Sequence, residues 1–233
     1  MTKTKRQRHL LTLAAGTLLL AAGTARADRP LVSETADVIG AGQCQVETGL
    51  AHASASGMAS LRSIDVFGSC GVAGHTQLGI ALGSSRQAGA TDLGLTLVGK
   101  HTLKMPEDGA IGYGVAYALG MEKASGGHWR HGSARLLGVA TKDLAKGLLG
   151  HANLGWERTQ ADRLNSTLWS LGAESDSGLR WAADVFGDDR SRPWLSAGLL
   201  FPLSDKLSAN ASYAQQFERT RVRLWTLGFK VEL

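Results

Sequence analysis

The sequence predicts an all-β protein that closes into an antiparallel transmembrane barrel of about twelve strands. The stretch 219–233 largely alternates between two faces up to the last residue, as a strand does. Its more apolar face carries Arg223, Trp225, Leu227, Phe229, Val231 and Leu233. Such a final strand resembles the closing strand and assembly signal of a bacterial outer-membrane barrel. Beyond residue 27, no apolar run reaches the length of a membrane helix and no long helical period appears, so strands are the expected way across a membrane.

The N-terminus predicts a cleaved secretory signal peptide over 1–27. Four basic residues lie between positions 3 and 8, an apolar run covers 10–22, and Ala25-Arg26-Ala27 supplies a small-residue cleavage site. The alternative is an uncleaved inner-membrane anchor, but the apolar run is shorter than the roughly 20 residues that a spanning helix needs. We therefore expect three regions: the signal peptide, an N-terminal segment 28–41 and a barrel over 42–233.

Alternating segments separated by turn-like residues recur along the whole mature chain. They are expected at 42–54, 60–72, 75–85, 91–104, 109–122, 132–143, 147–158, 164–175, 178–187, 193–203, 206–217 and 219–233. Single-chain outer-membrane barrels have even strand numbers, and an even count places both termini in the periplasm. The sequence thus predicts localisation in the bacterial outer membrane.

The connections fall into two alternating classes. Short periplasmic turns are expected at 72–75, 105–108, 144–146, 176–177 and 204–205, and longer polar connections facing outward at 84–91, 123–132, 158–163 and 188–192. Several segments have one face suited to lipid, for example Ile111 to Leu119 and Leu195 to Phe201 in alternate positions. Aromatic girdles are expected from Trp156, Trp181, Tyr213, Trp225 and Phe229. The alternative is a soluble β-sandwich with an ordinary core.

Two cysteines lie at corresponding positions of the first two segments. A hairpin centred on Gly57 sets Cys44 opposite Cys70 and pairs Val46 with Gly68. Since exported proteins fold in an oxidising compartment, we expect a disulfide between the two cysteines. The alternative is two buried free thiols. A zinc site is not expected, because two isolated cysteines lack a zinc-binding spacing.

The stretch 29–49, with Gly40-Ala41-Gly42-Gln43-Cys44 at its centre, resembles the start of the outer-membrane proteins named after the meta-cleavage pathway of phenol degradation. The pieces 71–79, 185–187, 203–207 and 227–228 are similar too. This resemblance implies a transmembrane barrel that acts as an outer-membrane transporter or channel. It does not imply phenol as the substrate, because the shared motifs are turn and strand patterns.

With the apolar faces against lipid, the opposite faces line the interior. The predicted lining residues are Glu47, Asp65, Asp92, Lys100, His151, Asn153, Glu157, Arg180, Asp184, Asn210, Lys230 and Glu232. Their charges have mixed sign, so they either line a path for a permeant or pair with one another and fill the barrel. The segment 28–41 either plugs the interior or hangs in the periplasm. We expect a passive channel or transporter for small molecules, with hydrophobic or aromatic compounds as candidates; the alternative is a structural or interaction barrel with a filled interior.

An outer-membrane hydrolase is the third hypothesis, because some barrels use Ser and His near the outer rim. His52-Ala53-Ser54 offers the residue types but no recognisable hydrolase signature, so we do not expect an enzyme. The loop 128–131, with His128 and His131, is a weak metal or lipopolysaccharide signal, and no cofactor is expected. The expected partners are outer-membrane lipid, lipopolysaccharide and the barrel-assembly machinery. The net charge of +5 includes the basic signal residues, and nothing supports nucleic-acid binding.

Overall fold

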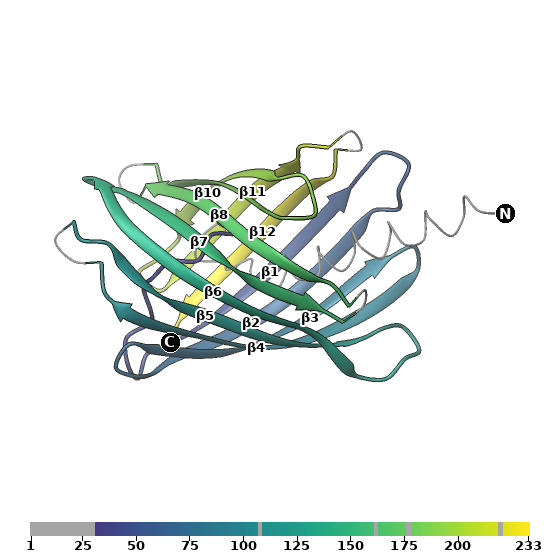
Figure 1. Cartoon of the computed structure of the whole chain (residues 1–233), viewed down its shortest axis with the longest axis horizontal. Helices are drawn as coiled ribbons and strands as arrows, with labels where there is room; N and C mark the ends of the chain where they lie inside the picture. Colours follow the sequence, from purple (N-terminus) through teal and green to yellow (C-terminus); the bar gives the residue numbers. More distant parts are fainter. Residues whose placement is uncertain (1–30, 107–108, 161–162, 176–178, 219–220) are drawn as a thin grey trace.

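The computed structural model describes residues 31–233, apart from 107–108, 161–162, 176–178 and 219–220, and the predicted signal peptide lies outside this part. Twelve strands make one closed barrel (Figure 1). They are β1 Cys44–Ser54, β2 Leu61–Ala73, β3 Thr76–Gln87, β4 Ala90–Lys104, β5 Gly112–Lys123, β6 Arg130–Ala145, β7 Leu148–Thr159, β8 Asn165–Ser175, β9 Trp181–Asp188, β10 Trp194–Pro202, β11 Leu207–Gln216 and β12 Arg223–Glu232. In the part of the chain described, no helix is long and apolar enough to cross a membrane.

Each strand pairs antiparallel with its neighbour in sequence, and β12 closes the barrel against β1. Gln45 at the start of β1 lies opposite Glu232 at the end of β12, so the first strand begins where the last one ends. We call this the terminus end and the opposite one the loop end (Figure 1). The predicted fold class and all twelve predicted strands are confirmed, with boundaries that differ by no more than four residues.

One loop-end connection is much shorter than expected. The sequence predicted a polar connection over 84–91, but β3 continues to Gln87 and β4 begins at Ala90, which leaves a two-residue turn. Ala88 and Gly89 both have positive φ, at 49° and 86°. Two-residue hairpin turns with positive φ at both positions match the twist of the flanking strands, and glycine adopts this conformation without steric cost. The polar residues of 84–87 belong to the strand and not to a loop, with Ser85 buried and Arg86 exposed.

The strands alternate between an exposed apolar face and a buried, more polar one. In β7, Leu154 is 65% exposed while its neighbour Asn153 is 7% exposed. The lipid-facing prediction is confirmed for Tyr113 and Leu195, which are both exposed. The single closed barrel rules out the alternative of a two-sheet sandwich. A barrel with this apolar exterior is suited to lipid, and the chain forms an outer-membrane β-barrel.

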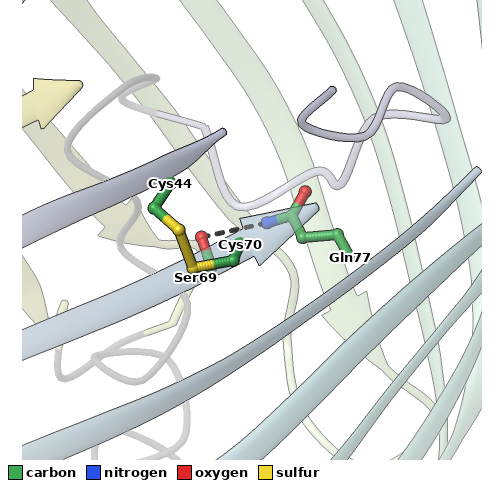
Figure 2. Close-up of a disulfide and its surroundings, with 4 residues drawn as sticks. All are labelled: Cys44, Ser69, Cys70 and Gln77. Atoms are coloured by element: carbon green, nitrogen blue, oxygen red, sulfur yellow. Dashed lines mark hydrogen bonds between the residues drawn. A yellow bond between two sulfur atoms is a disulfide. The ribbon is translucent and has the colours of Figure 1, made fainter. Parts of the chain in front are cut away.

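The predicted disulfide is present at the start of the barrel (Figure 2). Cys44 and Cys70 are bonded and lie directly opposite each other in the β1–β2 ladder. The predicted pairing of Val46 with Gly68 is also confirmed. The bond thus links two strands near the terminus end, next to the point where the chain enters β1.

Candidate functional site

Most of the predicted interior residues are buried in the barrel. Those below 10% exposure are Glu47, Asp65, Lys100, His151, Asn153, Glu157, Asp184, Asn210 and Lys230. Polar and charged groups that are buried must be hydrogen-bonded, paired or hydrated, because their transfer out of water is otherwise costly. The interior is therefore the place where the chemistry of this chain is concentrated.

The other three predicted interior residues lie elsewhere. Asp92 is half-buried near the loop end, where its Oδ1 accepts a hydrogen bond from the backbone N–H of Ser125 at 3.0 Å. Arg180 is exposed, because β9 begins one residue after it. Glu232 is exposed at the last position of β12 and forms a 2.7 Å ion pair with Lys230. Of these three, only Glu232 contacts a member of the buried set, Lys230.

Residues 31–43, which we call the strap, lie against the inner wall before the chain enters β1 (Figure 1). The strap begins at Asp184 in β9. One carboxylate oxygen of Asp184 accepts hydrogen bonds from the backbone N–H groups of Val32 and Ser33, at 2.6 and 2.9 Å. The other oxygen accepts a bond from the hydroxyl of Ser196 in β10 at 2.6 Å. Asp184 is 2% exposed, so these donors take the place of water around a buried acceptor.

The next contacts of the strap are with β7. Asn153 holds Glu34 by both of its backbone groups: Oδ1 accepts from the N–H at 2.7 Å, and Nδ2 donates to the carbonyl at 2.8 Å. The same Oδ1 accepts from the hydroxyl of Ser170 in β8 at 2.9 Å. An amide side chain that presents one donor and one acceptor matches the peptide group, as a neighbouring strand would.

Ala36 lies between β4 and β6. Its N–H donates to Oγ1 of Thr141 at 2.9 Å, and its carbonyl accepts from the hydroxyl of Thr102. Its side chain is fully buried in an apolar cluster with Ala116, Leu137 and Val139. The strap is thus fastened here by both polar and apolar contacts.

The last part of the strap reaches β3 and β2. The N–H of Ile39 donates to Oε1 of Gln77 at 3.2 Å, and Nε2 of Gln77 donates to Oγ of Ser69 at 3.2 Å (Figure 2). Gly71 in β2 then exchanges backbone hydrogen bonds with the strap, from Gly42 N–H to Gly71 O at 2.9 Å and from Gly71 N–H to Gln43 O at 3.0 Å. The strap therefore crosses the inner wall from β9 to β2.

One ion pair connects a strap side chain to the wall. Nζ of Lys100 lies 3.8 Å from a carboxylate oxygen of Glu34 and 3.5 Å from Oγ1 of Thr35. Closer to the loop end, Arg135 in β6 donates to one carboxylate oxygen of Glu157 in β7 through Nε and Nη2, both at 3.0 Å. These pairs balance charge inside the barrel without requiring a bound ion.

The interior also has apolar surface. Leu168 in β8 packs against the cluster that contains Leu137 and Val139. Phe186 in β9 and Trp194 in β10 lie opposite each other in the ladder, with ring centroids 6.1 Å apart and planes 7° apart. By strand alternation they share the inward face of Asp184 and Ser196. The barrel interior thus combines a polar wall with aromatic and aliphatic patches.

Several wall residues that hold the strap, or that bond to the side chains holding it, were not predicted from the sequence: Gln77, Thr102, Thr141, Ser170 and Ser196. All five are buried. All five are uncharged, whereas the predicted set consisted of charged side chains, one histidine and two asparagines. Strand alternation could have found some, because Thr102 lies two residues from Lys100 and shares its face.

The other candidate sites gain no further ligands. In residues 31–233, outside the four short gaps, no group of three or more His, Cys, Asp or Glu side chains could hold a metal ion. His52 and Ser54 lie in β1, and both are half-buried. His151, which is buried, pairs with Thr141 through Nδ1 at 3.1 Å and faces Glu174 through Nε2 at 3.4 Å.

Comparisons with known proteins agree on the fold. A family model described as "Uncharacterised conserved protein UCP029691" matches residues 15–232. No match emerges among curated proteins. The barrel is similar to a KdgM porin in complex with disordered oligogalacturonate, with a TM-score of 0.60 and 8% identity over 80% of this chain and 99% of the other. It is similar to the COG4313 outer membrane channel from Pseudomonas putida F1, with a TM-score of 0.58 and 10% identity over 84% and 97%.

A third similar structure is the CymD monoaromatic hydrocarbon channel, with a TM-score of 0.51 and 10% identity over 83% of this chain and 89% of the other. At these identities the likeness concerns the fold, which these outer-membrane channels share with this chain.

Proposed function

The chain belongs to the family described as Uncharacterised conserved protein UCP029691, and we propose that it is an outer-membrane channel for the passive diffusion of small molecules, narrowed by the strap. The observation that carries the proposal is the contrast between the two faces of the barrel. Outside, Leu154 and Leu171 are more than 60% exposed, as lipid-facing side chains are. Inside, charged, amide and hydroxyl groups from most of the strands are gathered around one axis.

The inner wall already binds a chain of peptide groups, which supports its ability to bind other polar groups. Asp184 and Thr141 accept hydrogen bonds from the strap, and Asn153 both accepts from it and donates to it. These three wall residues do not bond to one another. Side chains inside a barrel determine what passes through it. We therefore assign the predicted interior residues that are buried to the lining of the permeation path.

The apolar patches favour permeants that carry an aromatic or aliphatic part. Phe186 and Trp194 present aromatic rings to the interior, and Leu137 and Leu168 extend the apolar surface. A path lined with both polar groups and aromatic faces suits small amphipathic molecules such as aromatic acids. This proposal agrees with the resemblance to the phenol meta-pathway proteins and with the likeness to a monoaromatic hydrocarbon channel.

Matched permeants test this substrate class. In a planar bilayer that contains the mature protein, reversal potentials give the relative permeability of benzenesulfonate and methanesulfonate, which carry the same charge and differ by the aromatic ring. We expect benzenesulfonate to permeate at least as well as the smaller methanesulfonate. In Trp194→Ala, the permeability of benzenesulfonate relative to methanesulfonate should fall. A permeability that follows size alone, in both the wild type and the variant, would overturn the aromatic preference.

The alternative of a barrel with a filled interior is favoured by one observation. Ala36 of the strap is fully buried against Ala116, Leu137 and Val139, as in a protein core. In that case the polar groups stabilise the barrel and the protein acts through its surface. The two functions differ in whether water reaches the ion pairs of the interior, such as Arg135 with Glu157.

A further inference from the structure

We propose that the strap is a hinged gate, in which residues 40–43 stay attached to β2 while residues 31–39 detach from the wall and open the lumen. This inference rests on the proposed channel function and adds its regulation. It follows from the two different ways in which the two parts of the strap are bound.

The hinge is part of the barrel backbone. Gly71 exchanges two backbone hydrogen bonds with Gly42 and Gln43, at 2.9 and 3.0 Å. A Cβ at Gly71 would lie 2.3 Å from the carbonyl oxygens of Ile39 and Gly40, so only glycine allows this approach. Cys44, which follows Gln43, and Cys70, which precedes Gly71, form the disulfide. A covalent bond and paired backbone therefore keep this end of the strap in place.

The latch, residues 31–39, is held differently. Most of its hydrogen bonds join strap backbone to the ends of wall side chains, namely Asp184, Asn153, Thr141, Thr102 and Gln77. No strand ladder with the wall includes these residues in the described part of the chain. Each bond can be exchanged for water without breaking any barrel pairing, because the wall side chains stay on their strands. Release of the latch thus leaves the barrel intact.

The contacts also indicate which residues determine closure. The wall recognises the strap mainly through its N–H and C=O groups, which every residue except proline offers. The specificity of the latch therefore lies mainly in the wall. The strap side chains that also make polar contacts with the wall include Ser33, Glu34 and Thr35. Asp184 is the most important wall group, because it binds the part of the strap farthest along the chain from the hinge and is the only charged acceptor of strap N–H groups among these contacts.

A comparison of two Asp→Ala variants shows whether the latch moves independently of the hinge. Asp184→Ala removes the acceptor of the Val32 and Ser33 amides, whereas Asp65→Ala removes another buried carboxylate that makes no hydrogen bond to the described strap. Hydrogen exchange of the folded protein is measured in both. We expect exchange at Val32 and Ser33 to accelerate about tenfold or more in Asp184→Ala, as the loss of a charged hydrogen bond implies. Exchange at Gly42 and Gly71 should not change, and exchange of the strap amides in Asp65→Ala should match that of the wild type.

A cysteine lock tests whether the movement gates the channel. A Cβ at Gly172 in β8 would lie 3.1 Å from Cβ of Ser33. A small outward shift of the strap therefore brings the pair Ser33→Cys and Gly172→Cys to the roughly 3.5–4.5 Å between Cβ atoms that a disulfide needs. In a planar bilayer, the oxidised pair should lose at least nine-tenths of the wild-type open time and regain it on reduction. The single variants and the wild type under the same reductant are the controls, and the latter reports any effect of the native Cys44–Cys70 bond.

The outcomes distinguish the gate from the channel. A conducting wild type whose lock leaves the open time unchanged overturns the gate alone. Uniform acceleration of exchange from residue 32 to residue 43 in Asp184→Ala overturns the hinge. Folded protein that is silent in the bilayer both with and without residues 31–39 overturns the channel proposal and the gate with it. A silent wild type whose deletion variant conducts overturns the gate alone.

Discussion

Asp184 shows how this chain accommodates charge inside a membrane barrel. Its carboxylate is buried, yet it accepts hydrogen bonds from two strap amides and the Ser196 hydroxyl. A buried ionised group without such donors would cost several kcal/mol or more. The sequence could predict that Asp184 faces inward, since alternation depends only on neighbours in the chain. It could not predict its partners, because Val32 and Asp184 are 152 residues apart.

The pair Arg135 and Glu157 tests at the residue scale whether the interior is wet. Both side chains are less than 15% exposed, and they bond to each other and not to the strap. In a dry interior, Arg135→Ala leaves an unpaired buried carboxylate and costs about 3–5 kcal/mol of unfolding free energy. In a hydrated channel, water solvates Glu157 and the coupling between the residues falls to about 1 kcal/mol or less.

We expect a coupling energy of about 1 kcal/mol or less between Arg135 and Glu157. It is measured by a double-mutant cycle with Arg135→Ala, Glu157→Ala and the double variant, using denaturant unfolding from lipid vesicles. The double variant controls for the lost packing of the two side chains. A coupling energy above about 3 kcal/mol would support the filled barrel instead.

At the scale of elements, strand alternation and turn chemistry determine most of the structure. The β1–β2 hairpin was predictable in register because Gly57 sets its centre and a slip by one residue would turn every apolar side chain to the wrong face. The β3–β4 connection was not, because the polar residues on both sides of it resemble a loop although they belong to the two strands. A polar lumen makes inward strand positions and loops similar in composition, which is why boundaries are less certain here than in a soluble sheet.

The apolar belt gives a prediction at this scale. Leu154 lies near the middle of β7 and is 65% exposed, whereas Leu144 is 57% exposed and lies one residue from the terminus end of β6. Leu154→Arg should lower the unfolding free energy in lipid vesicles by about 2–4 kcal/mol, because it places a charge near the midplane. Leu144→Arg makes the same chemical change near the membrane boundary and should cost about 1 kcal/mol or less. Equal costs for the two variants would contradict the placement of the belt.

At the scale of the whole molecule, the closed twelve-stranded barrel followed from an even strand count and a final strand that pairs with the first. The course of the strap could not be predicted in this way. Its residues have no strand period, and its binding depends on side chains from β3, β4, β6, β7 and β9 that come together only when the barrel closes. A plug and a free periplasmic segment have the same local sequence pattern, so only the assembled wall distinguishes them.

The central claim is that the interior conducts. The most direct test is the single-channel conductance of the refolded mature protein in a planar bilayer, with heat-modifiable mobility on a gel as the measure of folding. We predict discrete current steps, which are brief in the wild type because the strap closes the lumen most of the time, and longer after deletion of residues 31–39. Silence from folded protein, both with and without residues 31–39, would contradict it.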